Sequence, residues 1–308
     1  MKPHAADGAH EADAPDALRS AAQPSRRRLA THPRLADDAR KMINGEKVLV
    51  ARHSAFQAIR LTENAAGLRT LRFGADGPSQ SIVKVGDPRH LELPYARVLP
   101  ACLAFTPNPR RVLIVGLGGG TIPRFLHSHF PEMIIDVVEL DPAVVTLARE
   151  YCGFEEGARL RVHVDDGRDF IEASSGGYDV IILDSFDTDS IPAHLTTLEF
   201  GSAVREALAP EGMAIANVWG RATNPLYASM LLTYRAAFED LYIFDVPAPG
   251  TKLFVALPHR QAMTRAELIE KAREISRRHE FLYDLSGAIA GFRNAALETV
   301  RAGAVLRD

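Results

Sequence analysis

The sequence is poor in cysteine, in long apolar runs and in excess charge of either sign. Only Cys102 and Cys152 occur among 308 residues, which provides neither a disulfide framework nor a cysteine-based metal site. The 36 basic and 39 acidic side chains leave a net charge of −3, so the chain as a whole does not attract nucleic acid or an anionic membrane surface. No run of about 18 apolar residues suggests a membrane span. The first residues lack the apolar core of a signal peptide, so we expect a cytoplasmic protein.

Several catalytic signatures are also missing. The chain has no GxSxG nucleophile elbow and no HExxH zinc motif, and its glycine-rich turn lacks the Lys-Ser/Thr pair of a P-loop. His127 and His129 stand two residues apart in an expected helix and therefore do not share a face on which a metal could sit. These absences argue against serine-hydrolase, zinc-protease and P-loop chemistry, and we expect no metal cofactor.

Composition divides the chain into segments. Residues 1–44 are rich in Ala, Asp, Pro and Arg without apolar periodicity, which predicts a disordered tail. Residues 45–105 are expected to hold a small antiparallel β-meander, followed by a linking helix over 91–105. The expected meander strands are short runs of Val, Ile, Leu and Phe between turn residues, at 47–52, 56–62, 68–73 and 80–85.

Residues 106–260 alternate between strand and helix patterns, which is typical of a parallel sheet covered by helices. The last two strands, 241–246 and 252–257, are joined only by Pro247 to Thr251, a link that permits a hairpin but no parallel crossover. The sequence therefore predicts an α/β catalytic domain with a seven-stranded Rossmann-like sheet in which one strand is antiparallel. Residues 261–308 are expected to form a C-terminal helical extension, with helices over 264–279 and 294–301.

A glycine-rich turn follows the first strand of this domain. Arg111–Val115 is expected to be a buried strand, and Gly116 to Gly120 a sharp turn into a helix. Glycine tolerates positive φ and lets a ligand touch the backbone, and the helix N-terminus offers free N–H groups. Ligands of open parallel sheets bind beyond the carboxyl ends of the strands. We therefore expect a nucleotide or nucleoside site in contact with Gly116, Gly118, Gly119 and Gly120.

Acidic residues end the next strands. Glu139 ends the second strand about twenty residues after the turn, where a carboxylate can accept hydrogen bonds from both ribose hydroxyls. The third strand ends in Asp165, Asp166 and Gly167, where an acid can accept a hydrogen bond from the exocyclic amine of adenine. Asp166 is the better candidate for that contact, whereas Asp165 can serve as a helix cap.

The fourth strand ends in a dense acidic cluster that contains Asp184, Asp187 and Asp189. Carboxylates beside a nucleoside can bind a cationic group and take a proton from an attacking amine, and we assign these roles to Asp184 and Asp187. The fifth strand ends in Asn217-Val218-Trp219, which makes Asn217 a candidate for substrate contact. Trp219, the only tryptophan, suits the core or a pocket wall.

These segments resemble the spermidine synthases, a family of polyamine aminopropyltransferases. The run 178–187 is similar to the family's YDVIIxDSxD signature, and the runs 138–142 and 165–170 to its VExDP and DDGxxF segments. Residues 54–59 resemble its SxYQxI strand, and Tyr95 stands where its pocket tyrosine does. The resemblance covers residues 45–260, and several motifs in the same order make it specific at the superfamily level.

The resemblance implies a class I S-adenosylmethionine-dependent methyltransferase fold with a sulfonium nucleoside as co-substrate. Carried over by position, Glu139 would hold ribose and Asp166 adenine. The pocket for the nucleoside and the amine would be lined by Gln57, Gln80 and Tyr95.

The resemblance also implies the reaction. Asp184 and Asp187 would orient and deprotonate the attacking amine, which a small molecule or a protein would supply. The amine would displace the sulfonium in line, at the neighbouring carbon. The free edges of the meander would permit a homodimer.

Departures from the family pattern keep other functions open. The family's glycine turn reads GGGDGG, with an aspartate that contacts the aminopropyl ammonium, whereas Gly119 stands at that place here. The turn and the segment 127–131 look closer to spermidine-synthase-like methyltransferases, which include an enzyme acting on elongation factor 1A. The expected function is aminopropyl transfer from decarboxylated S-adenosylmethionine. The alternatives are methyl transfer from S-adenosylmethionine and non-catalytic nucleoside binding.

Overall fold

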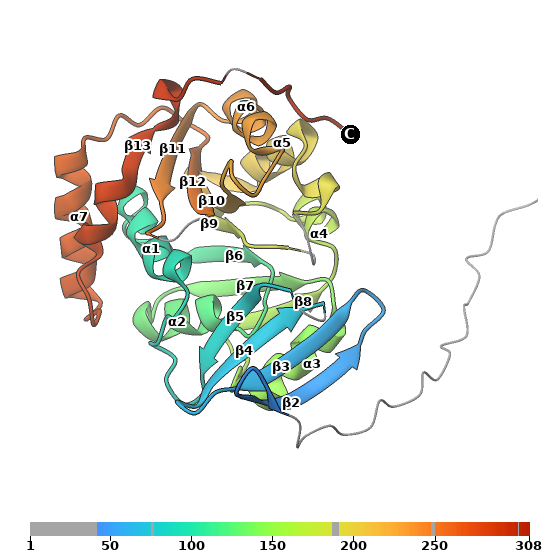
Figure 1. Cartoon of the computed structure of the whole chain (residues 1–308). Coiled ribbons are helices and arrows are strands. Elements are labelled where there is room, and N and C mark those ends of the chain that lie inside the picture. Colours follow the sequence, from blue (N-terminus) through green and yellow to red (C-terminus); the bar gives the residue numbers. More distant parts are fainter. Residues whose placement is uncertain (1–41, 75–76, 187–190, 248–249, 301) are drawn as a thin grey trace, which may run out of the picture. The chain divides into compact units, whose positions relative to one another are not determined.

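The computed structural model describes residues 42–74, 77–186, 191–247, 250–300 and 302–308 (Figure 1). The disordered tail expected over 1–44 lies outside the described residues as far as residue 41. Its last residues differ from the expectation, because Met42–Ile43 form a short strand, β1, that pairs with the next one. Within the described ranges, no helix is both long and apolar enough to cross a membrane.

The N-terminal part is an antiparallel meander, as expected. Its strands pair in sequence order and are β1, β2 (Glu46–His53), β3 (Ala58–Glu63), β4 (Leu68–Phe73) and β5 (Ser79–Lys84). Alternate apolar side chains such as Ile59, Leu71 and Val83 point to one face, where they pack on Val144 and Leu147 of the following domain. The four expected strands correspond to β2 to β5, and the expectation omitted β1, which has only two residues.

Strands and helices then alternate along the chain. The strands are β6 (Arg111–Val115), β7 (Ile134–Glu139), β8 (Leu160–Val164), β9 (Tyr178–Leu183), β10 (Leu208–Trp219), β11 (Asp240–Asp245), β12 (Thr251–Leu257) and β13 (Phe292–Asn294). The helices are α1 (Pro94–Cys102), α2 (Thr121–His129), α3 (Pro142–Tyr151), α4 (Gly167–Ala173), α5 (Leu198–Ala207), α6 (Tyr227–Ala237) and α7 (Arg265–Arg278). The short 3-10 turns are η1 (Leu103–Phe105), η2 (Ala193–Leu195), η3 (Leu285–Gly291) and η4 (Ala295–Leu297).

The strand order of the main sheet is β13-β11-β12-β10-β9-β6-β7-β8. The hairpin of β11 and β12 forms as expected, and β12 runs antiparallel to both β10 and β11. The expected count of seven strands with one antiparallel is corrected to eight with two, because β13 pairs antiparallel with the outer edge of β11. Three residues are too short to leave a pattern in the sequence. β6 lies between β7 and β9, so the chain order reverses there and opens a crevice at the strand ends.

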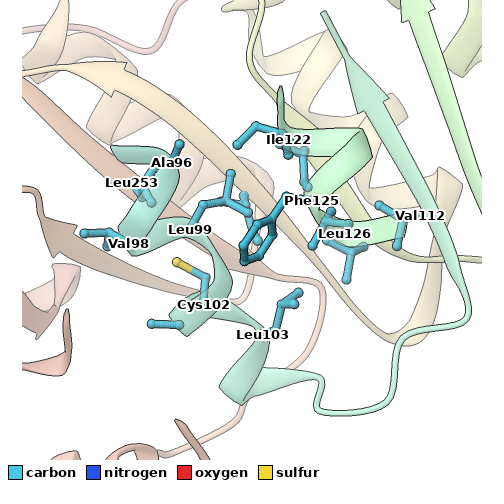
Figure 2. Packing of buried hydrophobic residues seen from close by; sticks show 14 of the residues in the cluster. Ala96, Val98, Leu99, Cys102, Leu103, Val112, Ile122, Phe125, Leu126 and Leu253 are labelled. Atoms are coloured by element: carbon cyan, nitrogen blue, oxygen red, sulfur yellow. The ribbon is translucent and has the colours of Figure 1, made fainter. Parts of the chain in front are cut away.

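Helices cover both faces of this sheet. One apolar cluster joins it to α1, α2, α3 and α7, and another joins it to α4, α5 and α6. Figure 2 shows Phe125 of α2 directed toward Leu99 and Cys102 of α1, and all three side chains are buried. Burial of this kind supplies most of the stability of such a layered domain, and it fixes the turn between β6 and α2.

The C-terminal extension only partly matches the expectation. Helix α7 forms over Arg265–Arg278 and begins with a capping box between Thr264 and Glu267. The helix expected over 294–301 is wrong, because Phe292–Asn294 pair with β11 and only a 3-10 turn, η4, follows. The apolar residues of this segment reach the sheet edge, and this long-range pairing prevails over a weak local helical pattern.

Candidate functional site

A cavity of about 650 Å³ lies at the carboxyl ends of β6, β7, β9 and β10, where the sheet topology predicts a ligand site. Its wall is completed by the meander, by the first turn of α1 and by the β11–β12 hairpin. The polar side chains in its lining come from Gln57, Ser79, Gln80, Ser81, Tyr95, Thr121, Glu139, Asp141, Asp184, Ser185, Asn217, Trp219, Thr223 and Thr251.

The glycine turn after β6 is in close contact with the end of β9. Gly116 has φ 102°, and a Cβ added there would lie 2.3 Å from the carbonyl oxygen of Asp184. Glycine is therefore required at this position for conformation and for space. The Asp184 N–H donates to the Val115 carbonyl at 2.9 Å, which continues the pairing of β6 and β9 to the cavity. This contact fixes the Asp184 backbone beside the turn.

The Asp184 side chain is held from two sides. The Tyr95 hydroxyl donates to Asp184 Oδ2 at 2.8 Å, and the Asn217 amide donates to Oδ1 at 2.9 Å. Burial raises the pKa of Asp184 above its ordinary value, although both hydrogen bonds partly offset that effect by favouring the ionised form. A carboxylate that is oriented in this way and has a raised pKa is suited to accept a proton from a bound substrate.

The Glu139 carboxylate organises the turn itself. It accepts a hydrogen bond from the Leu117 N–H at 2.9 Å and one from the Asp141 N–H at 3.0 Å. Burial raises the pKa of Glu139, and these backbone donors work in the opposite direction. Each carboxylate oxygen has a second lone pair, so the residue can still accept from ligand hydroxyls.

Three side chains in the lining carry a buried polar atom without a hydrogen-bond partner. These atoms are Gln80 Nε2, Asn217 Oδ1 and Asp141 Oδ2. The other carboxylate oxygen of Asp141 accepts from the Ala143 N–H and caps α3. Buried polar groups normally have partners, so one donor and two acceptors are left for a ligand to satisfy.

Most of the residues expected at the site converge on this cavity. The lining includes Gly116, Gly118, Glu139, Asp184, Gln57, Gln80, Tyr95 and Asn217. Asp187 lies outside the described residues, so its assignment as a second catalytic acid stays a prediction. Gly119, Gly120, Asp165, Asp166 and Gly167 were also expected to contact the cofactor, and none of them lines the cavity.

The adenine assignment of Asp166 stays a prediction, and the structure gives this residue a further role. Asp166 is itself the N-cap of α4, and its Oδ1 accepts from the N–H groups of Arg168 and Asp169. Its Oδ2 lies 2.9 Å from His194 Nε2. The cap was expected at Asp165, which instead accepts from the Asp166 N–H. The helix begins one residue later than expected, and this shift turns the Asp166 carboxylate toward the helix N-terminus.

The cofactor-binding assignments of Gly119, Gly120 and Gly167 also stay predictions, and the packing explains why these positions hold glycine. A Cβ on Gly119 would lie 2.5 Å from Val83 Cγ2 and 3.0 Å from Ser81 Oγ, so this residue faces β5 of the meander. Cβ atoms on Gly120 and Gly167 would meet Phe154 and Val115 at 2.4 Å. These glycines therefore allow close packing around the turn.

Some lining residues were not anticipated. Ser81 and Thr121 share a hydrogen bond of 3.1 Å across the junction of the meander and the turn, next to the anticipated Gln80 and Gly120. Phe186 was also not anticipated, and its ring stacks on Trp219, which lines the cavity as the expected pocket wall, with centroids 5.3 Å apart. Phe186 could have been found from its place directly after Asp184-Ser185.

The charge of the cavity has one sign. Its ionisable acids are Glu139, Asp141 and Asp184, and the described lining includes no lysine, arginine or histidine. Across the part of the chain that the structure describes, no group of three His, Cys, Asp or Glu side chains is arranged to hold a metal ion. The arrangement favours an organic ligand whose charged part is cationic.

Comparisons with known proteins agree with this geometry. The family model of the Spermine/spermidine synthase domain matches residues 97–241. The polyamine aminopropyltransferase of Vibrio vulnificus is 34% identical over 242 residues, covering 75% of this chain and 80% of that protein. The human eEF1A lysine and N-terminal methyltransferase is also 34% identical, over 220 residues that are 65% of this chain but only 31% of that protein.

A solved structure shares the fold. The crystal structure of a probable spermidine synthase from Corynebacterium glutamicum superposes with a TM-score of 0.64 at 22% identity, covering 72% of this chain and 86% of that one. The likeness includes the mixed sheet and the antiparallel N-terminal meander.

The packing around Gly119 yields a prediction. Gly119→Asp should lower the free energy of unfolding by about 1–3 kcal/mol, because its Cβ would overlap Val83. Urea unfolding of this variant, of Val83→Ala and of the double variant measures the coupling between the two sites. We expect the double variant to lose less stability than the sum of the single losses. Additive losses, with nucleoside affinity reduced by Gly119→Asp, would place Gly119 at the ligand.

Proposed function

The chain belongs to the spermine/spermidine synthase family, and from this membership we propose that it is an aminopropyltransferase. It moves the aminopropyl group of decarboxylated S-adenosylmethionine to an amine acceptor. The nucleoside occupies the cavity beside the glycine turn, with its ribose near Glu139 and its sulfonium near Asp184. The polyamine aminopropyltransferase relative, of which this chain covers 80%, supports the proposal.

The observation that carries the proposal is the sign of charge in the cavity. Apart from Tyr95, the ionisable side chains in the described lining are the carboxylic acids Glu139, Asp141 and Asp184, and no basic side chain faces them. The tail of decarboxylated S-adenosylmethionine ends in an ammonium, which these acids attract. The tail of intact S-adenosylmethionine adds a carboxylate, and a charge without a partner is costly to bury.

The geometry supports a central role for Asp184 in the proposed reaction. The acceptor amine attacks the carbon next to the sulfonium, a C–N bond forms and the C–S bond breaks. Its electron pair returns to sulfur, and 5′-methylthioadenosine leaves. The proton that the amine must lose goes to an Asp184 carboxylate oxygen, which Tyr95 and Asn217 hold in place. Because the sulfonium is already a good leaving group, positioning and proton removal supply the rate.

Methyl transfer is the second candidate, and Gly119 is the observation that favours it. The aminopropyltransferase family has an aspartate in its glycine turn that contacts the aminopropyl ammonium, and this chain has Gly119 at that place. Strand β5 fills the space beside Gly119. The eEF1A methyltransferase shares 34% identity with this chain. The same nucleoside contacts at Glu139 serve either reaction, so the tail of the nucleoside decides between them.

Calorimetric titration of the purified protein separates these functions. We expect decarboxylated S-adenosylmethionine to bind at least about tenfold more tightly than the intact form, a difference of about 1.4 kcal/mol. Tighter binding of the intact form would overturn the proposal in favour of methyl transfer. Absence of binding for both, and for 5′-methylthioadenosine, would contradict either enzymatic function.

Asp184→Asn tests the proton acceptor. The amide keeps the shape but cannot accept the proton, so turnover should fall by about a hundredfold or more. Binding of 5′-methylthioadenosine should change little. The matched control is Asp169→Asn, an exposed acid in the first turn of α4 that lies outside the cavity and should keep normal turnover. Normal turnover of Asp184→Asn would assign the base elsewhere.

Tyr95→Phe tests the pH dependence. The pKa of Asp184 is raised by burial, so activity should decline as the pH falls through that raised value and the carboxylate becomes protonated. Removing the Tyr95 hydroxyl removes a donor that favours the ionised form. The acid limb of the kcat/KM profile should therefore move to higher pH in the variant. A limb that stays in place, or moves to lower pH, would show that Asp184 does not control it.

A further inference from the structure

The segment 302–308 is attached to the helical layer on the second face of the sheet. Figure 1 shows it passing α6 and α5. The Ala304 N–H donates to Ser229 Oγ at 3.2 Å, and the Leu306 N–H donates to Thr233 Oγ1 at 2.9 Å, both on α6. The Leu306 carbonyl accepts from the N–H of Leu198, the first residue of α5, at 2.8 Å. These bonds bring Asp308 to the N-terminal end of α4.

Arg168 of α4 binds the last residue of this segment, Asp308. Its Nη1 and Nη2 donate to the two carboxylate oxygens of Asp308 at 2.7 and 2.6 Å, a bidentate pair. Its Nε donates to Glu172 at 2.7 Å, and Nη1 also points to the His194 carbonyl at 3.4 Å. The Arg168 side chain is only 18% exposed, although its partners are more exposed. The orientation of the planar guanidinium is therefore fixed, because Nε, Nη1 and Nη2 all donate hydrogen bonds.

His194 is held at two points as a result. Arg168 approaches its backbone carbonyl, and Asp166 Oδ2 lies 2.9 Å from its ring Nε2. His194 lies in η2, directly after Pro192 and Ala193, and Pro192 lines the cavity. Helix α4, which carries Arg168, and strand β8 both contact β7. Leu140, the residue after β7, also lines the cavity.

We propose that Arg168, fixed by Asp308, is a positioning residue for the nucleoside end of the cavity. Arg168 fixes the position of η2 and therefore the position of Pro192, which forms part of the cavity wall. Asp166 contributes to the same end because its carboxylate contacts the His194 ring. Asp166 thus acts on the nucleoside site indirectly, through the wall. The inference rests on the proposed function only in that a nucleoside occupies this cavity, and it holds for aminopropyl or methyl transfer.

Calorimetry and steady-state kinetics of Arg168→Ala and Asp308→Ala test this role. Each variant should bind 5′-methylthioadenosine or S-adenosylhomocysteine, whichever binds wild type more tightly, about threefold to tenfold more weakly. KM for the nucleoside should rise by the same factor, while kcat at saturation stays unchanged because Asp184 is untouched. The double variant should be no weaker than either single variant, because both changes remove one pair.

Arg307→Gln is the matched control. It lies in the same segment and removes an exposed pair with Glu199 without touching Arg168, so its affinity should stay within about twofold of wild type. Wild-type affinity in both Arg168→Ala and Asp308→Ala, additive losses in the double variant, or an equal loss in the control would overturn the proposal. The proposed function is tested separately by whether the wild-type protein prefers decarboxylated or intact S-adenosylmethionine. The inference depends only on the ratio of each variant's nucleoside affinity to that of the wild-type protein.

Discussion

The close approach of the Gly116 backbone to the Asp184 carbonyl is the constraint on which the site depends. Strands β6 and β9 are neighbours, and their carboxyl ends can stay paired up to the cavity only if residue 116 has no side chain. This contact places an acid from one strand beside the turn from another. Tyr95 and Asn217 then orient the acid from two further elements, so the pKa, position and direction of one carboxylate depend on four segments of chain.

The meander contributes to the same site from outside the main sheet. Its strand β5 packs Val83 against Gly119, and Ser81 shares a hydrogen bond with Thr121 at the start of α2. The glycine turn is therefore enclosed between β9 and β5, which explains the narrow space around it. The same packing makes an acid at position 119 costly, and within the described lining the negative charge of the cavity comes from acids at the strand ends.

Membership of the spermine/spermidine synthase family and similarity to a methyltransferase are compatible in physical terms. Both reactions use a sulfonium nucleoside, and both need a ribose contact such as Glu139 and a polar group that orients an amine. They differ in the carbon that is transferred and in the charge of the nucleoside's tail. The residues that separate them are the few that face that tail, and our proposal of the decarboxylated ligand rests on a described lining that holds acids but no bases.

The sequence by itself determined the alternation of strands and helices, the terminal hairpin and the acids at strand ends. These follow from local periodicity and from the rule that parallel strands end at one edge. Gln57, Gln80 and Tyr95 were accessible only through the resemblance, because their positions depend on how the meander folds back. Only the tertiary structure decided that Gly119 faces Val83 and that Asp166 caps α4. The direction of a side chain at a turn depends on where the helix begins and on which distant strand packs there, and no local pattern encodes either.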